Sequence, residues 1–170
     1  MEEKRRAFLD DLLSLSTPSG FETEGQRRWL EYIEPFADET HVDAYGNAVA
    51  VSEGDDDAPS IAVAGHGDEI GLMVRDITDD GFLELTRIGG SDRSVTRGQH
   101  VTVHTDEGSL DGVIGQVAIH LRDSSDDEYD EIAEQHVDIG VEDGDTARDR
   151  VDIGDPVTLR TRVGDLADGR

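Results

Sequence analysis

The stretch IAVAGHGDEIGL, residues 61–72, decides how the chain is organised. Its first four residues, Ile61 to Ala64, form a short apolar run, which predicts a strand buried on both faces of a sheet. Glycines and charged residues follow directly, so the strand is expected to end at Gly65. After Gly71 the sequence shows mainly short strands and tight turns. The stretch 61–72, called the motif below, therefore also marks a boundary between two regions.

The region before the motif, residues 1–71, is predicted to be the start of an α/β domain. Apolar residues at helical spacing predict a helix over 3–16, and a second helix is predicted over 22–33. Thr17-Pro18-Ser19-Gly20 separates the two helices. Short β signals at 40–43 and 47–52 flank a hairpin turn at 45–47. Two helices and about three strands are too few for a complete doubly wound domain, so we expect its sheet to be completed by residues outside this chain.

The region after the motif contains mainly short strands and tight turns. Their even spacing predicts a small β-barrel or sandwich over residues 72–163, and residues 164–170 are expected to return to the first domain. An acidic loop with at most one helical turn is predicted at 123–134, and a short helix at 145–150. The predicted strands are 72–77, 82–88, 101–104, 110–114, 117–119, 137–141 and 156–162.

Charge is the dominant feature of the composition. Forty-one acidic residues against 15 basic ones give a net charge of −26, and such a load destabilises a compact state by self-repulsion. Molar salt shortens the Debye length to about 3 Å, so we interpret the chain as a cytoplasmic protein of an extreme halophile; an ordinary acidic protein is the alternative. Phosphate binding needs basic patches, which argues against nucleic-acid or anionic-membrane partners. Cysteine is absent, and no apolar run reaches the length of about 20 residues that a membrane helix needs.

His66 and Asp68 are the best candidates for chemistry. Alternate residues of an extended segment point the same way, and ligands bind at strand ends in open α/β sheets. A metal-binding histidine commonly donates its other ring N–H to a carboxylate. The spacing suits His66 as a metal ligand with Asp68 as its orienting partner, or both as ligands. The alternative is a loop histidine stabilised by a neighbouring acid.

The other histidines and the acidic runs are weaker candidates. His100 and His104 would share a strand face, but no fixed carboxylate is near them in the sequence. The acidic runs 55–57 and 126–130 lack the spacing of a calcium-binding loop and are interpreted as solvated faces. The remaining histidines, interpreted as surface or barrel-edge residues, are His41, His120 and His136.

Seven short stretches, in order along the chain, resemble the tetrahedral (glutamyl-type) aminopeptidase family, whose members are sometimes labelled endoglucanases. The resemblance implies an α/β peptidase domain interrupted by a small, PDZ-like β-barrel that serves in assembly. It also implies homo-oligomers in the form of tetrahedral dodecamers. The stretches are 15–22 (LSTPSGFE), 43–47 (DAYGN), 65–74 (GHGDEIGLMV), 88–90 (IGG), 112–115 (GVIG), 137–140 (VDIG) and 153–157 (IGDPV).

The resemblance assigns roles to the motif. His66 is expected to bind one of two zinc or cobalt ions, and Asp68 to be the catalytic-site carboxylate that holds His66. Glu69 matches the motif without being a ligand in the family, and Gly67 stands where many members carry a larger residue. Of five expected metal ligands, His66 alone falls within residues 1–170.

The function implied is a metal-dependent aminopeptidase that releases N-terminal residues from peptides, with the isolated 170-residue chain expected to be inactive. One alternative is a non-catalytic oligomerisation or binding module, in which the β-domain is the working part. A glycan hydrolase is the less favoured alternative. Such enzymes place two carboxylates across the scissile bond, and no such pair stands out here.

Overall fold

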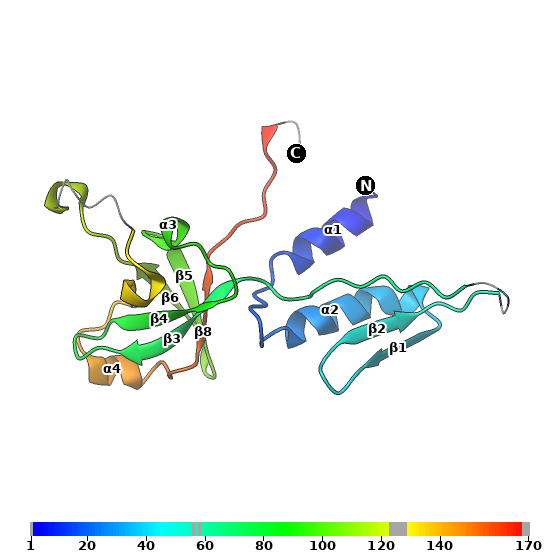
Figure 1. Ribbon diagram of the computed structural model, residues 1–170, viewed down its shortest axis with the longest axis horizontal. Helices are drawn as coiled ribbons and strands as arrows, with labels where there is room; N and C mark the ends of the chain where they lie inside the picture. Colours follow the sequence, from blue (N-terminus) through cyan, green and yellow to red (C-terminus); the bar gives the residue numbers. More distant parts are fainter. Residues whose placement is uncertain (1, 56, 58, 123–128, 168–170) are drawn as a thin grey trace. The chain divides into compact units, whose positions relative to one another are not determined.

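The computed structural model describes residues 2–55, 57, 59–122 and 129–167 (Figure 1). The chain divides into two compact units, residues 1–69 with 162–170, and residues 70–161. Within the described residues, none of the helices has the length and apolar character needed to cross a membrane.

The described residues of the first unit form two helices, a 3₁₀ turn and a two-stranded antiparallel sheet. The helices pack through aromatic side chains, with the rings of Phe8 and Tyr32 stacked 3.7 Å apart. The first helix ends four residues before its predicted end, because Ser14 and Leu15 donate backbone bonds only three residues back as the chain approaches Pro18. The elements are α1 Glu3–Leu12, α2 Thr23–Ile33, η1 Glu34–Phe36, β1 Glu39–Val42 and β2 Ala48–Val51.

The hairpin between β1 and β2 confirms the prediction of a turn at 45–47. Asp43 closes it, since one carboxylate oxygen accepts hydrogen bonds from the backbone N–H groups of Tyr45 and Asn47. Gly46 has a φ of +88°, a conformation that glycine adopts without steric cost.

The prediction of a buried strand at residues 61–64 is wrong for the described chain. These residues belong to no strand, and the side chains of Ile61 and Val63 are 85% and 96% exposed. A strand is stabilised by hydrogen bonds to a neighbour, and β1 and β2 pair only with each other among the described residues. An apolar run predicts that a segment can be buried in a sheet, but not where its neighbour comes from.

The second unit is a closed antiparallel barrel with strand order β3-β4-β7-β6-β5-β8, which confirms the predicted small barrel. Alternate residues point inward, so Leu83 and Leu85 of β4 and Val101 and Val103 of β5 are fully buried. The strands are β3 Gly71–Ile77, β4 Leu83–Ile88, β5 His100–Thr105, β6 Gly108–Ile114, β7 His136–Asp138 and β8 Pro156–Leu159.

Short helical turns connect the barrel strands: α3 Arg93–Thr96, η2 Ile119–Leu121, η3 Ile132–Glu134 and α4 Gly144–Arg148. The sequence interpretation missed α3, which begins where the Asp92 carboxylate accepts a bond from the Ser94 N–H. It correctly expected a short helix near α4, where Asp143 caps the Thr146 N–H in the same way. Asx caps of this kind satisfy N–H groups that have no partner within the helix.

The predicted strand at 117–119 is wrong, because residues 115–118 are irregular and residues 119–121 form η2. After β6, Gly115 donates to the His136 carbonyl, and the chain then leaves the ladder. Strand β7 ends at Asp138, earlier than predicted, because Gly140 turns the chain with a φ of +77°. Of the predicted acidic run at 126–130, residues 126–128 lie outside the described part of the chain.

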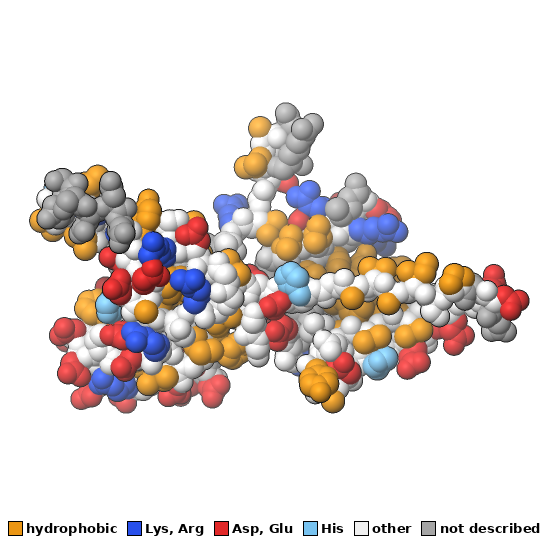
Figure 2. Space-filling model, viewed as in Figure 1, with side chains coloured by type: hydrophobic (Ala, Val, Ile, Leu, Met, Phe, Trp, Pro, Cys, Tyr) orange, Lys and Arg blue, Asp and Glu red, His pale blue; other side chains and the backbone are white. Residues whose placement is uncertain are grey.

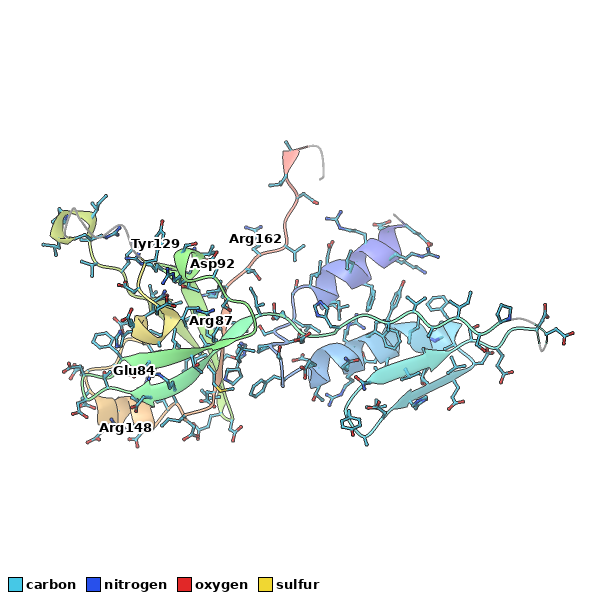
Figure 3. All side chains as sticks on the ribbon, in the orientation of Figure 1. Glu84, Arg87, Asp92, Tyr129, Arg148 and Arg162 are labelled. Carbon is cyan, nitrogen blue, oxygen red and sulfur yellow. The ribbon has the colours of Figure 1, made fainter. Side chains whose placement is uncertain are left out.

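Arginines on the barrel surface are paired with carboxylates and hold η3 against β4. Two of the residues involved, Glu84 and Arg87, are labelled in Figure 3. Glu131 accepts from Arg93 and lies 3.5 Å from Arg87. Arg75 bonds Glu84 and also donates to the Ala133 carbonyl at 3.1 Å. Each pair is partly exposed and contributes little stability by itself, but together they fix the position of the segment after residue 129.

Candidate functional site

The motif that begins at His66 is held in place by the turn between α1 and α2. The backbone N–H of Glu69 donates to the Thr17 carbonyl at 2.9 Å, and the N–H of Ser19 donates to the Glu69 carbonyl at 3.3 Å. Pro18 and Glu69 thereby form a parallel β-bridge. Residues about 50 positions apart in sequence therefore lie side by side, and both belong to the first unit.

His66 and Asp68 are brought together as predicted. The Nδ1 atom of His66 lies 2.8 Å from Asp68 Oδ1 and 3.0 Å from the Asp68 carbonyl oxygen. Both neighbours are acceptors, so Nδ1 carries the proton and Nε2 holds the lone pair in the neutral ring. The side chain of His66 is 86% exposed, and its Nε2 lies on the ring edge away from the carboxylate.

Ser19 is a further member of the site that the sequence interpretation missed. Its hydroxyl donates a hydrogen bond to Asp68 Oδ2, so both oxygens of Asp68 accept bonds. The pKa of Asp68 is held below its usual value mainly by the hydrogen bond from the Ser19 hydroxyl and next by that from the His66 ring. Hydrogen bonds to the charged form of a carboxyl group favour that form. Ser19 lies within the family-like stretch 15–22, but nothing in the sequence links it to a residue 49 positions away.

Glu69 stabilises the turn rather than pointing away from it. Its Oε1 accepts the backbone N–H of Thr17 at 2.8 Å, a structural role that accords with its exclusion from the expected ligands. Gly67 has a neighbour that a larger residue would displace, since a Cβ atom there would lie 2.6 Å from Nε2 of Gln26. Gln26 also accepts the Ala48 N–H, so it fills the space beside the motif.

The remaining histidines do not join the site. His104 Nε2 lies 2.9 Å from the Thr158 hydroxyl across neighbouring strands of the barrel. His41 lies near Glu39, and His136 contacts the ring of Phe82. Within the part of the chain that the structure describes, no group of three or more His, Cys, Asp or Glu side chains could hold a metal ion. Among the described residues, His66 and Asp68 therefore do not by themselves form a metal site.

The sequence profile of the M42 glutamyl aminopeptidase family matches residues 46–170. The chain belongs to this family. The match covers both the motif at His66 and the whole barrel, so the resemblance seen in the sequence is confirmed. The family is one of metallopeptidases, which implies divalent metal ions.

Individual relatives agree with the family assignment. A putative aminopeptidase of Acetivibrio thermocellus is 36% identical over 155 residues, 91% of this chain and 44% of the relative. The structure of a TET aminopeptidase from a marine sediment thaumarchaeon is similar, with 32% identity and a TM-score of 0.90. The superposition covers 99% of this M42 chain and 48% of the TET aminopeptidase chain.

A third relative, the TET1 peptidase of Pyrococcus horikoshii, is 32% identical, with a TM-score of 0.82 over 95% of this chain and 48% of its own. That peptidase can assemble into a tetrahedron or a large octahedral shell. Endoglucanase-labelled proteins also occur among the structural neighbours. The M42 chain spans about half the length of the relatives it matches, and the α/β fold with a small barrel is confirmed.

Proposed function

We propose that this chain forms the first part of a metal-dependent aminopeptidase, which releases N-terminal residues from peptides, and supplies one metal ligand to its active site. The observation that carries the proposal is the arrangement at His66, whose Nδ1 is bonded to Asp68 while Nε2 faces away. Membership of the M42 family supports the reaction class.

In this proposal His66 binds a metal ion through Nε2 and Asp68 holds the ring. Orientation by a carboxylate fixes the tautomer of a metal-binding histidine and raises its basicity. Both Asp68 oxygens already accept hydrogen bonds, which favours the orienting role over direct ligation. The ions themselves, zinc or cobalt, would supply Lewis-acid polarisation of the peptide carbonyl and activation of water.

A catalytic zinc site needs about three protein ligands, so the proposal requires ligands beyond His66. It is tested by comparing the full-length gene product with the 170-residue chain on an aminoacyl-anilide, with zinc or cobalt added. We expect the full-length product to cleave the substrate, a chelator to stop it, and the 170-residue chain to be inactive. Cleavage by the 170-residue chain, or of cellulose instead of peptide, would contradict the proposal.

We further propose that the protein self-associates through an acid-poor surface of the barrel. The runs 93–105 and 112–122 contain no Asp or Glu, although the chain has 41 acidic residues. They are adjacent in the barrel, because Gly98 donates to the Ile114 carbonyl at 3.1 Å. At a net charge of −26, two copies repel each other least where carboxylates are few and are paired with arginines, as Glu131 is with Arg93.

This surface also exposes apolar side chains, which favour burial against a partner. Val117, Ile119 and Leu121 are 53%, 79% and 72% exposed. Figure 2 shows carboxylates gathered on the side of the barrel that carries α4. The assembly described for the TET1 peptidase supports a second copy of the chain as the partner.

Charges placed on this surface are expected to weaken self-association. The double variant Ile119→Asp, Leu121→Asp in the full-length gene product should sediment as smaller species than the wild type in molar potassium chloride. Ile153→Asp adds a charge at another site on the barrel that is 66% exposed, and it should leave the sedimentation unchanged. A double variant that assembles like the wild type would show that the interface lies elsewhere.

The charge of the chain supports a third proposal, that the protein works in a cytoplasm of molar salt. Screening should relieve the repulsion among its carboxylates. We expect the thermal unfolding midpoint of the 170-residue chain to rise steeply as potassium chloride increases from about 0.1 to about 2 M. Circular dichroism at each concentration measures it, and a midpoint independent of salt would count against salt adaptation.

A further inference from the structure

The turn at residues 17–20 is built to present one hydroxyl to the candidate site. Pro18 is fully buried, and Thr17 nearly so. The Phe21 N–H donates to the Pro18 carbonyl at 2.8 Å, and Gly20 has a φ of +95°. The turn is therefore closed by its own backbone bonds at one end and anchored by buried side chains at the other.

The same turn is fixed to the motif by bonds on both sides of Ser19. Glu69 accepts the Thr17 N–H through its carboxylate and the Ser19 N–H through its carbonyl. The Ser19 backbone thus has little freedom to move relative to Asp68. Its hydroxyl reaches Asp68 Oδ2, the oxygen that does not contact His66.

We propose that Ser19 is a positioning residue, which orients His66 for metal binding by holding the Asp68 carboxylate. An ionised carboxylate only accepts hydrogen bonds, so Ser19 and His66 must both donate to it. With Oδ2 held by Ser19, Oδ1 is held opposite Nδ1 of the ring. The proton then stays on Nδ1, and the lone pair of Nε2 faces outward. This inference rests on the proposed metal role of His66.

The arrangement does not make Ser19 a nucleophile. A nucleophilic serine is activated by a base within hydrogen-bond reach, which in serine hydrolases is an imidazole that in turn bonds a carboxylate. Here the hydroxyl bonds the carboxylate directly, and the imidazole lies on the other oxygen. The order of the three groups therefore suits orientation of the ring and not attack on a carbonyl.

The first test measures the ring of His66 without metal. Nitrogen NMR of the 170-residue chain at a fixed, neutral pH reports the tautomer, and a His66→Gln variant assigns the signal among the six histidines. We expect the Nδ1–H form to dominate in the wild type, and Ser19→Ala to give a mixture of tautomers. Ser19→Thr keeps the hydroxyl and should restore the wild-type signal. Ser14→Ala, which removes a hydroxyl bonded to the Asp10 carbonyl, is the matched control and should change nothing.

The second test measures metal affinity in the full-length gene product by competition with a chromophoric chelator. Loss of a group that orients a metal ligand typically weakens metal binding by about 10- to 100-fold, and we expect a loss in this range for Ser19→Ala alone. An unchanged tautomer and an unchanged affinity in Ser19→Ala would overturn the inference. If His66→Gln leaves metal binding intact while Ser19→Ala shifts the tautomer, the metal role of His66 fails and the positioning role stands.

Discussion

Replacing His66 by alanine is expected to lower the aminopeptidase activity of the full-length gene product by more than about 100-fold. Removing a group that merely orients a metal ligand costs about 10- to 100-fold, and removing the ligand itself should cost more. The side chain is 86% exposed, so its loss should leave folding intact. Initial rates on an aminoacyl-anilide, with bound metal measured in the same samples, check the prediction.

The control for this variant is His41→Ala, which removes an exposed imidazole from β1 of the first unit. It should keep the wild-type rate and metal content. If His66→Ala retained most of both, His66 would be a surface histidine stabilised by its neighbouring acid. That alternative was open from the sequence, and the contact between Nδ1 and Asp68 is compatible with it.

Replacing Leu85 by alanine is expected to destabilise the barrel by about 2 to 5 kcal/mol, the usual range for a buried leucine. The Leu85 side chain is fully buried in the barrel core, and a closed barrel cannot collapse easily around the cavity. Chemical unfolding is carried out in molar potassium chloride. Hydrogen exchange of the amides in β3 to β8 then measures the loss of stability in the barrel itself.

An exposed apolar residue of the same unit provides the comparison. Ile153 is 66% exposed, and Ile153→Ala should change the free energy of unfolding by less than about 0.5 kcal/mol. If the two variants unfolded alike, the inward direction of the β4 side chains would be wrong.

Local patterns in the sequence predicted most of the elements because those elements depend on near neighbours. The alternation of apolar residues in β4 and β5 and the turn at Gly46 need no information from distant residues. Helix α3 was not predicted, nor was the irregular conformation of residues 115–118, because the sequence patterns there are weak. There, bonds to distant groups, such as Gly115 to the His136 carbonyl, decide the conformation.

The sequence by itself predicted the barrel from its evenly spaced short strands. It also predicted the pairing of His66 with Asp68, because alternate residues of an extended chain share a face. Only the tertiary structure brought Ser19 to Asp68, since that contact needs the turn between the helices to lie against a segment about 50 residues later. It also left Ile61 and Val63 exposed. An apolar run records that a segment is suited to burial, but burial itself depends on the partner that the rest of the fold provides.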